Sequence, residues 1–421
     1  MSASPSFRAI DACRVCGSTE LRSVLDLGEQ CLTGVFPRAK GAKVTKGPLE
    51  IVKCVGDRDA CSLVQLRHNY DPAEMYGTHY GYRSSLNRSM VEHLRAKVRS
   101  LVSRQPVKAG DVVLDIGSND GTTLSFYPEN AKLIGMDPTA VNFAKYYKGH
   151  IQVVADYFSA DAFLRATGGV RARIVTSIAM FYDLERPLEF MRQVHAVLAD
   201  DGIWHFEQSY LPSMVSANSY DTICHEHAEY YALGPIVWMA DRVGFSIVDV
   251  SLNDINGGSF AVTVAKAKPG ATKHAAVVAR MLEEEQRHGL TSLEQFGRFA
   301  DGVHRHKTEL RALLEGLKAG GKRVLGMGAS TKGNVILQYC GIGPELLPCI
   351  AEVNEDKFGC FTPGTEIPIV SEAEAFAQKP DVLLVLPWHF RDNLVRRSAP
   401  LLERGIKLLF PLPKIEFVPA S

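Results

Sequence analysis

A segment near the middle of the chain gathers side chains suited to moving a proton. Residues 218–231 read Asn-Ser-Tyr-Asp-Thr-Ile-Cys-His-Glu-His-Ala-Glu-Tyr-Tyr, with His225 and His227 on either side of Glu226. The His-Glu-x-x-His spacing of a helical zinc site is absent, which disfavours metal binding. A histidine titrates near neutral pH, and a neighbouring carboxylate can orient it or tune its pKa. We therefore interpret the segment as a site of general acid–base chemistry, with solvated surface polarity as the alternative.

A glycine turn after an apolar run is the second candidate site, and we expect a helix to follow it from Thr122 onward. Residues 112–121 read Val-Val-Leu-Asp-Ile-Gly-Ser-Asn-Asp-Gly, and Gly117 and Gly121 allow backbone to approach a ligand closely. The pattern is Asp-x-Gly-x-Asn-x-Gly rather than Gly-x-Gly-x-x-Gly, which favours a ligand without a pyrophosphate. The next apolar run, 131–136, ends in Asp137, whose carboxylate can hold both hydroxyls of a ribose. The alternative is a turn that serves packing alone.

This turn and its acid resemble the S-adenosylmethionine (SAM) site of class I methyltransferases. The resemblance implies that SAM is bound by Asp115, Gly117, Asn119, Gly121 and Asp137, with Asp156 at the adenine. Later apolar runs at 174–180 and 202–208 would be the fourth and fifth strands of the same sheet. Tyr182 follows the fourth, at the edge where ligands of α/β sheets bind.

The cysteines predict a metal site near the N-terminus. Cys13 and Cys16 form a C-x-x-C knuckle, and Cys54 and Cys61 follow about forty residues later with a wider spacing. Four thiolates would make a tetrahedral structural zinc site with no open coordination position. Cys31 is a possible substitute ligand, and a set of small buried thiols is the alternative.

Two further clusters could contact a substrate. Tyr76, Tyr82 and Asn87 belong to a polar and aromatic stretch that could anchor an interface or close over a sugar or ketone. Residues 326–334 form a glycine turn opening a helix, suited to phosphate through backbone amides and a cation, or to packing alone. The candidates there are Ser330, Lys332, Asn334 and, after the next apolar run, Glu352.

The arrangement of these motifs predicts three domains. Residues 1–75 form the cysteine-rich part, and 76–265 alternate strand-like and helical stretches, as in a parallel α/β sheet. Residues 266–421 begin with a charged helical linker and then restart a strand–glycine–helix alternation, which predicts a second, smaller α/β domain. The fold class is therefore α/β, with two Rossmann-like sheets and a zinc-binding segment.

Composition excludes several classes of protein. The 421 residues carry 47 basic and 47 acidic side chains, without the basic excess of a nucleic-acid binder. No apolar run reaches the ~18 residues of a membrane helix, and the N-terminus lacks the apolar core of a signal peptide. We expect a soluble cytoplasmic protein whose nine cysteines are reduced, acting as a monomer or small homo-oligomer.

Taken in order along nearly the whole chain, the motifs resemble the SAM-dependent nucleotide-sugar C-methyltransferase family. The cysteine-rich start, the turn at 115–121, the His-Glu-His segment and Gly-Met-Gly-Ala-Ser-Thr-Lys-Gly-Asn at 326–334 carry the resemblance. It implies a zinc-binding domain, a class I SAM domain and a C-terminal Rossmann-like domain that helps to hold a nucleotide-sugar. It also implies an enzyme of deoxysugar biosynthesis acting on a TDP-, GDP- or CDP-linked 4-keto-deoxysugar.

The resemblance implies the chemistry as well. A base removes the acidified proton next to the ketone, C3 being the expected carbon, and the enolate carbon takes the methyl group of SAM. The base would be His227, or failing it His225, with Glu226 orienting it and Tyr76 donating to the ketone oxygen. The alternative is O- or N-methylation of another small molecule, which needs no enolate.

Two positions depart from the family pattern. Cys224 stands where the family often has a tyrosine, and the fourth strand is followed by Phe181 and Tyr182 where the family often has a histidine. We expect Tyr182 to substitute as proton carrier or oxyanion donor.

Overall fold

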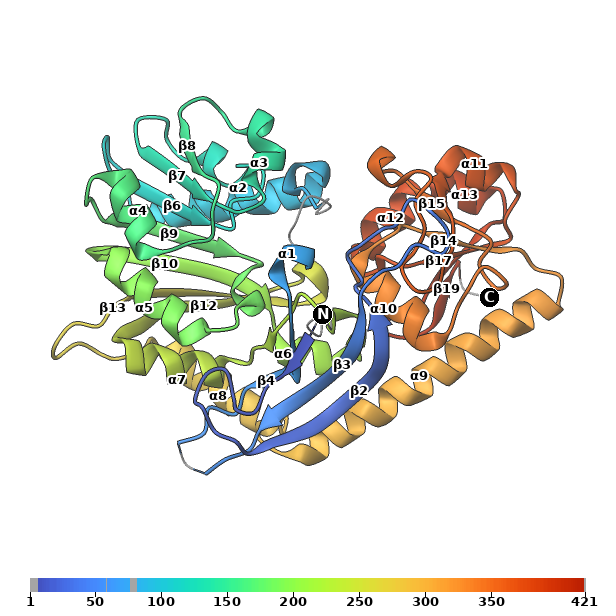
Figure 1. Cartoon of the computed structure of the whole chain (residues 1–421), viewed down its shortest axis with the longest axis horizontal. Coiled ribbons are helices and arrows are strands. Elements are labelled where there is room, and N and C mark those ends of the chain that lie inside the picture. The colour runs from blue at the N-terminus through green and yellow to red at the C-terminus, as the bar shows by residue number, and fades with distance from the viewer. Residues whose placement is uncertain (1–6, 58, 76–81, 420–421) are drawn as a thin grey trace, which may run out of the picture.

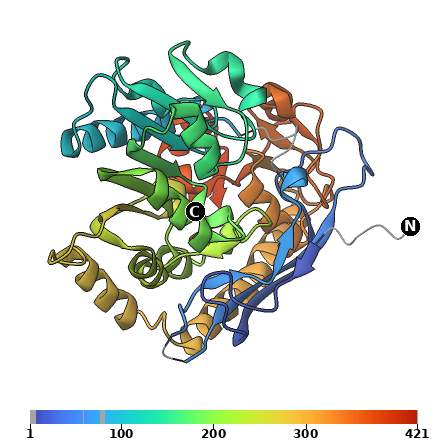
Figure 2. The same cartoon turned by 60° about the vertical axis from the view of Figure 1, so that its left-hand side comes forward.

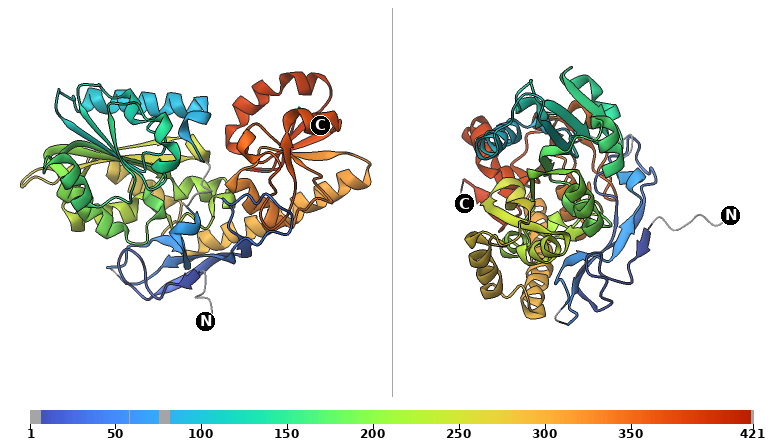
Figure 3. Two further views of the ribbon diagram at one scale, coloured as in Figure 1. Left: turned by 45° about the horizontal axis from the view of Figure 1, so that its top comes forward. Right: turned by 90° about the vertical axis from the view of Figure 1, so that its left-hand side faces the viewer.

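Two α/β units stand side by side in the computed structural model, which describes residues 7–57, 59–75 and 82–419 (Figure 1). An N-terminal sheet lies beneath them, and the long helix α9 (Leu293–Ala319) runs along the base of the molecule toward the C-terminal unit (Figures 1 and 3). None of the helices in the described ranges combines the length and apolar character that crossing a bilayer requires.

The central unit is built on a seven-stranded sheet in the order β12-β13-β10-β9-β6-β7-β8. Pairing is parallel from β10 to β8, whereas β13 is antiparallel to both β10 and β12. All five residues of β6 are buried, as expected for a strand covered on both faces. The strands are β6 (Val112–Ile116), β7 (Lys132–Met136), β8 (Ile151–Val154), β9 (Ala172–Ile178), β10 (Leu198–Ser209), β12 (Phe245–Asn253) and β13 (Ser259–Lys266).

Helices cover this sheet, with one exception to the sequence-based expectation. The helix α2 (Arg88–Arg104) buries Met90, Leu94, Val98 and Leu101, at the spacing of one helical face. The helix expected from Thr122 onward is wrong, because only the single 3-10 turn η2 (Leu124–Phe126) follows the glycine turn. Pro128 disfavours helical backbone at Tyr127, which is extended with φ −77° and ψ 158°. The remaining helices are α3 (Ala140–Phe143), α4 (Ala160–Thr167), α5 (Pro187–Val197), α6 (Leu211–Ser216), α7 (Leu233–Val243) and α8 (Ala276–Arg287).

The N-terminal sheet includes one strand from residues 218–231, which we call the histidine segment. Its order is β11-β4-β3-β2, and β11 (Glu229–Tyr230) pairs antiparallel with β4 (Val64–Leu66). The long hairpin strands β2 (Leu21–Cys31) and β3 (Lys46–Cys54) form the outer part, and β1 (Phe7–Ala9) and β5 (His68–Tyr70) pair separately. The short helix α1 (Pro72–Met75) follows. The histidine segment is therefore fixed to this sheet by backbone hydrogen bonds.

The first five strands of the C-terminal unit repeat the order of the first five strands of the central sheet. The C-terminal sheet runs β16-β15-β14-β17-β18-β19, parallel except for the last strand. The strands are β14 (Val324–Met327), β15 (Ile350–Glu352), β16 (Ile369–Ser371), β17 (Val382–Val385), β18 (Lys407–Phe410) and β19 (Glu416–Val418). The helices are α10 (Thr331–Cys340), α11 (Glu372–Ala377), α12 (Arg391–Arg397) and α13 (Ala399–Glu403).

The hydrophobic cores cross the boundaries between these units. Leu49 and Ile51 of β3 are fully buried in a core that also contains Phe296 of α9 and Leu325 of β14. Cys13, Cys54 and Cys61 belong instead to the core of the central sheet. The N-terminal sheet thus packs against both α/β units, along the side seen in Figure 2.

Candidate active site

The glycine turn after β6 has the close backbone approach that its sequence predicts. Gly117 and Gly121 have φ of +72° and +75°, in the left-handed region that favours glycine. A Cβ on Gly117 would lie 3.0 Å from Met180 Cγ, and one on Gly121 would lie 2.7 Å from the Tyr147 ring. The turn therefore has no room for side chains at either position.

Two buried carboxylates stand behind the turn. Asp137 accepts hydrogen bonds from the Asn119 N–H at 2.8 Å and from the Thr139 N–H at 2.7 Å, so it fixes the backbone of the turn. Asp115 accepts from the Thr176 hydroxyl at 2.5 Å, and burial raises its pKa to about 7. Asp156 is exposed beyond β8 and accepts from the N–H of Tyr157 at 2.7 Å. Of the three acids predicted for the cofactor, Asp115 lies near the end of β6, Asp137 directly follows β7, and Asp156 lies two residues beyond β8.

Residues 82–84 are held against the same turn by hydrogen bonds to Asn119. The Asn119 amide donates to the Tyr82 carbonyl at 3.0 Å and accepts from the Ser84 N–H at 3.0 Å. Asn87 accepts from the Ser89 N–H and so caps α2. Tyr82 is half exposed, and the predicted Tyr76 lies outside the described residues. Asn119 thus binds the chain's own residues 82–84, beside the predicted cofactor site.

The two histidines of the His-Glu-His segment lie in different surroundings. His225 is 2% exposed and packs edge-on against Tyr70 of the N-terminal sheet, with 4.7 Å between ring centroids. Burial lowers the pKa of His225 to about 4. Its ring belongs to the contact between domains, whereas His227 lies beside Tyr182, with 4.3 Å between ring centroids.

His227 is held in the form that a general base requires. Its Nδ1 lies 2.8 Å from the Thr222 carbonyl, which can only accept, so we assign the ring proton to Nδ1 and the lone pair to Nε2. Burial, and then the charge of Lys332, lower the pKa of His227 to about 4, so the ring is neutral at pH 7. The ring borders a small, partly open cavity of about 10 Å³, lined also by Tyr182, Ser209, Tyr210, Leu211, Met214, Thr222, Glu229 and Tyr230.

Glu226 lies against the N-terminal segment at 33–34, a contact that the sequence analysis did not predict. Its carboxylate interacts with the Cys224 thiol and the Thr33 hydroxyl, and burial raises its pKa. A Cβ on Gly34 would collide with its Oε1, so Glu226 reaches the N-terminal segment at 33–34. The carbonyl of Thr222, rather than Glu226, orients the His227 ring.

The four predicted cysteine ligands converge. Cys13, Cys16, Cys54 and Cys61 place their sulfurs within 4.8 Å of one another, including Cys13–Cys61 at 3.4 Å and Cys16–Cys54 at 3.5 Å. A tetrahedral zinc with Zn–S bonds of about 2.3 Å needs sulfurs about 3.8 Å apart, so this donor set fits zinc. The wide spacing of the second pair does not prevent convergence. Cys31 lies elsewhere, with its backbone bonded to the Gln338 amide at 2.8 and 3.2 Å.

The zinc knuckle contacts the histidine segment. Arg14, between the first two cysteines, donates to the Leu66 carbonyl at 2.5 Å, and its Nε lies 4.0 Å from Glu229 Oε1. Both side chains are almost completely buried, at 2% and 0% exposed. Metal ligation therefore fixes a residue that packs directly on the strand following His227.

The second glycine turn uses its side chains to join domains. Ser330 accepts from the Gly333 N–H at 3.0 Å and caps α10, while Asn334 donates to the Thr33 carbonyl at 2.7 Å. Lys332 donates to the Asn256 carbonyl of the central unit at 2.7 Å. Glu352 accepts three backbone N–H groups, from Ala329, Val353 and Asn354. Of the four candidates predicted here, Lys332 is the one whose charge lowers the pKa of His227.

Sequence reasoning missed the carboxylate that joins the two α/β units. Asp221 is fully buried, and Trp388 Nε1 donates to its Oδ2 at 2.7 Å across the domain boundary. Its position in the histidine segment, four residues before His225, was the available signal, but no periodic pattern marks such a contact.

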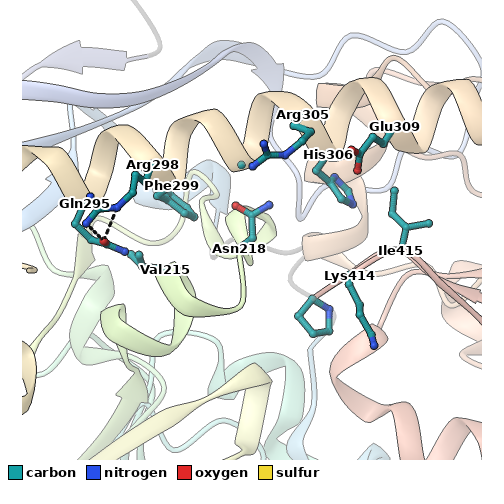
Figure 4. Close-up of a pocket in the computed structure, with 12 residues that line it drawn as sticks. Val215, Asn218, Gln295, Arg298, Phe299, Arg305, His306, Glu309, Lys414 and Ile415 are labelled. Carbon is teal, nitrogen blue, oxygen red and sulfur yellow. Dashed lines mark hydrogen bonds between the residues drawn. The ribbon is translucent and has the colours of Figure 1, made fainter. Parts of the chain in front are cut away.

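A larger cavity of about 390 Å³ lies away from these groups, between α9 and residues 413–415 (Figure 4). Its lining includes Arg298, Arg305 and His306, and Asn218 is its only residue from the histidine segment among the described residues. None of the predicted catalytic residues that the structure describes borders it.

Comparison with known proteins gives matches over most of the chain. Family models described as "Putative zinc binding domain", "Methyltransferase domain" and "C-methyltransferase C-terminal domain" match residues 13–76, 90–250 and 254–413. C-methyltransferase NovU from Streptomyces niveus is 33% identical over 421 residues, covering 98% of each chain.

Solved structures match over less of the chain. The 1,6-didemethyltoxoflavin-N1-methyltransferase of Burkholderia thailandensis has a TM-score of 0.33 and 13% identity, over 44% of this chain and 81% of that one. A chain of the complex between the Haloferax volcanii Trm112 methyltransferase activator and a methyltransferase has a TM-score of 0.35 and 13% identity, over 44% and 95%.

Proposed function

The chain belongs to the C-methyltransferase family of NovU, and on that premise we propose that it methylates a carbon next to the ketone of a nucleotide-linked 4-keto-deoxysugar. It is a SAM-dependent methyltransferase with a zinc-binding N-terminal domain. The proposed carbon is C3, and the proposed nucleotide is TDP, GDP or CDP. We assign zinc binding to residues 1–75, SAM binding to 76–265, and nucleotide-sugar binding to 266–421.

The observation that carries the proposal is the state of His227. O- or N-methylation needs no carbon acid to be deprotonated, whereas a C-methylation next to a ketone does. A neutral imidazole with its lone pair on Nε2, at the edge of a cavity, supplies that base. Tyr182 beside it can carry the proton onward or donate to the oxyanion. Tyr76 remains the proposed donor to the ketone oxygen.

The cofactor would be held on the glycine turn after β6. SAM supplies, when bound, a methyl group on a sulfonium sulfur that leaves with the bonding electrons. Asp137 fixes the backbone of the turn, and Asp115 near the end of β6 and Asp156 beyond β8 offer further carboxylates. The four thiolates would hold zinc with no open position, so the metal is structural.

Substrate contacts are proposed at the boundary between the two α/β units. Tyr82, Asn87, Ser330, Lys332, Asn334 and Glu352 are the candidates. Of these, Lys332 donates to the Asn256 carbonyl of the central unit, while Ser330 caps α10 and Asn334 donates to the Thr33 carbonyl of the N-terminal segment. None of the nine cysteines, all of which are described, forms a disulfide, which suits a reducing cytoplasm, where we place the activity.

The test is incubation with SAM and a panel of nucleotide-linked 4-keto-deoxysugars, with products examined by mass spectrometry and NMR. A new methyl group on the ring carbon next to the ketone is the expected result. A methyl group on oxygen or nitrogen would leave the cofactor assignment standing and overturn the proposed chemistry.

A further inference from the structure

A buried carboxylate near the end of β10 connects this strand to α2 and β12. The Glu207 side chain is 3% exposed, and its Oε1 lies 2.6 Å from His93 Nε2. Its Oε2 accepts from the Lys97 ammonium at 2.7 Å, and the two partners lie one turn apart on the same face of α2. Asn253, the last residue of β12, donates to the same Oε2 at 2.7 Å. Glu207 therefore fixes α2 to the sheet at one defined position.

The groups around Glu207 form a complete network. Burial by itself would raise the pKa of Glu207, but the His93 hydrogen bond and the charge of Lys97 lower it to about 2, so the carboxylate is ionised at pH 7. Lys97 also donates to His205 Nε2 at 3.2 Å, and burial, followed by the charge of Lys97, lowers the pKa of His205 to about 3. This neutral ring in turn donates from Nδ1 to the Thr263 hydroxyl at 2.9 Å.

Stability is a weak reason for such a cluster. Apolar residues of similar volume often stabilise a fold as well as a buried ion pair does, although breaking an existing pair is costly. Charged partners add direction, because hydrophobic contacts are non-directional. The apolar face of α2, from Met90 to Leu101, would tolerate small shifts along the sheet that the bonds to Glu207 do not. The cluster therefore sets the register of α2 on β10.

The register of α2 matters because the residues just before this helix lie on the glycine turn after β6. The Ser84 N–H donates to the Asn119 side chain and the Ser85 N–H to Asp120 Oδ2, each at 3.0 Å. The helix begins three residues later, and His93 lies in its second turn. Because hydrogen bonds between successive turns make a helix move as a unit, a shift of α2 would carry residues 84 and 85 away from the turn.

The main chain of Glu207 leads to the same turn by a second route. Its carbonyl accepts the Ala179 N–H at 2.7 Å, and Ala179 has φ +53°, which is uncommon outside glycine. The following Met180 lies against the glycine turn, where a Cβ on Gly117 would be 3.0 Å from its Cγ. Such backbone persists only where its surroundings determine it, and it is concentrated at active sites. Both the side chain and the main chain of Glu207 thus act on the predicted cofactor site.

We propose that Glu207 is a positioning residue for cofactor binding, whose carboxylate sets the register of α2 and so holds residues 84 and 85 against the glycine turn. The inference rests on the proposed placement of SAM on that turn. It gives Glu207 no contact with the cofactor and no part in proton transfer. SAM would meet a turn that is already in its binding shape, which lowers the cost of ordering that turn on binding.

The experiment measures SAM affinity for Glu207→Gln in the full-length, zinc-loaded enzyme. Glutamine has the size of glutamate, but it lacks the charge and places an NH₂ group among the donors Lys97 and Asn253. The matched control is Asp249→Asn, because Asp249 accepts from Arg104 at 2.6 Å and fixes the opposite end of α2 to β12. Calorimetric titration gives the SAM Kd, and amide hydrogen exchange read by mass spectrometry reports on the segment before α2.

Further variants separate positioning from stability. Leu101→Ala removes a buried side chain from the same helix, so it lowers the free energy of unfolding and keeps the groups bonded to Glu207. Urea unfolding shows how much stability each variant loses. His93→Phe removes one bond to Glu207 from a side chain that is 18% exposed, so it tests the proposal even if Glu207→Gln does not fold.

For Glu207→Gln we expect the SAM Kd to rise about 10-fold and hydrogen exchange before α2 to become faster, as for a residue that acts on a ligand without touching it. His93→Phe should raise the SAM Kd about 3-fold. Turnover at saturating SAM should change little in both, because lost cofactor binding raises KM and leaves kcat in place. Asp249→Asn and Leu101→Ala should bind SAM with wild-type affinity.

An unchanged SAM Kd in folded Glu207→Gln would overturn the proposal, and so would an equal rise in Leu101→Ala, since either result would reduce the cluster to a matter of stability. The proposed function is tested separately. Wild-type enzyme that forms no C-methyl product would refute the proposed acceptor, whatever the SAM Kd values are. Normal SAM binding by Gly121→Ala would refute the placement of the cofactor on the turn.

Discussion

The two α/β units share one local arrangement of turn and acid, but the side chains of their turns contact different parts of the molecule. In each sheet the first strand ends in a glycine turn, and the second strand ends in an acid that accepts backbone N–H groups, Asp137 in one and Glu352 in the other. The side chains of the central turn bind residues of the central unit, as Asn119 does with Tyr82 and Ser84. Those of the C-terminal turn reach the other domains, through Lys332 and Asn334.

The difference shows that a strand–glycine–helix motif predicts a backbone shape and does not by itself predict a ligand. The central turn is self-contained, so its predicted cofactor site should depend little on the other domains. The C-terminal turn is a junction of three domains, so whatever it does should depend on all of them. Four experiments test this contrast.

Removal of zinc should have the largest effect and should separate the two turns. Structural zinc contributes on the order of 10–16 kcal/mol in small zinc domains, so Cys54→Ser should disorder the sheet that carries β11. We expect turnover to be lost while SAM binding to the central turn survives. Metal analysis should give about one zinc per chain in the wild type.

The matched control is Cys31→Ser, a cysteine of the same sheet that lies outside the cluster. It should retain zinc and turnover. Loss of zinc from this variant would place Cys31 among the ligands and contradict the site described here.

Substitution of the base should come next. His227→Ala removes the Nε2 lone pair, and loss of a general base lowers kcat by about 10²–10⁴-fold. SAM affinity should stay unchanged, because the predicted cofactor site lies on the glycine turn after β6 and not in the histidine segment. Deuterium exchange next to the ketone should vanish as well, and its persistence would transfer the role to His225 or Tyr182.

Two glycine substitutions compare the turns directly. Gly121→Ala and Gly328→Ala introduce the same strain, because both positions have positive φ, +75° and +82°, and a Cβ 2.7 Å from a neighbouring ring. Such strain costs about 1–3 kcal/mol. Calorimetric titration should show weaker SAM binding, by about 10-fold or more, for Gly121→Ala alone. Equal losses in both variants would mean that the turns do not act independently.

The smallest effect concerns pH and the other histidine. The folded pKa of His225 is about 4, below the ordinary 6.5, so the unfolded chain binds its proton first as the pH falls. Its contribution to stability is therefore present above pH 6.5 and is lost between about 6.5 and 4. From pH 7 to 5.5 it should lower the free energy of unfolding by about 1 kcal/mol.

His225→Phe should reduce this pH dependence in urea unfolding measured across the same range. The same substitution should leave deuterium exchange at the substrate intact, in contrast to His227→Ala. A loss of exchange in His225→Phe at unchanged stability would reverse the roles of the two histidines.

Much of the fold follows from local pattern. The apolar runs ending at Ile116 and Met136 became β6 and β7, and the restart after Gly321 became the second sheet. The helix expected after the first glycine turn was the exception, because Pro128 disfavours helical backbone at Tyr127 and only a single 3-10 turn forms before it. The convergence of the four cysteines was also predictable, since metal ligation explains two separated pairs in one segment.

The contacts that side chains make across the boundaries between domains could not be predicted from local pattern. His225 and His227 are two residues apart in an irregular segment, and their surroundings depend on how β11 pairs with β4. Glu226 meets Thr33, Asn334 meets the same residue's carbonyl, and Asp221 meets Trp388, all across long stretches of chain. Periodicity reports burial within an element and carries no information about such partners.

The amino-acid sequence by itself determined the elements, the two glycine turns and the metal ligands, because each depends on backbone preferences or on the chemistry of nearby residues. Only the tertiary structure decided which histidine borders the cavity, and that Lys332 bonds to the Asn256 carbonyl of the central unit. Those outcomes depend on how three separately specified units pack, and the closeness of that packing is set by contacts such as Gly257 against Trp388.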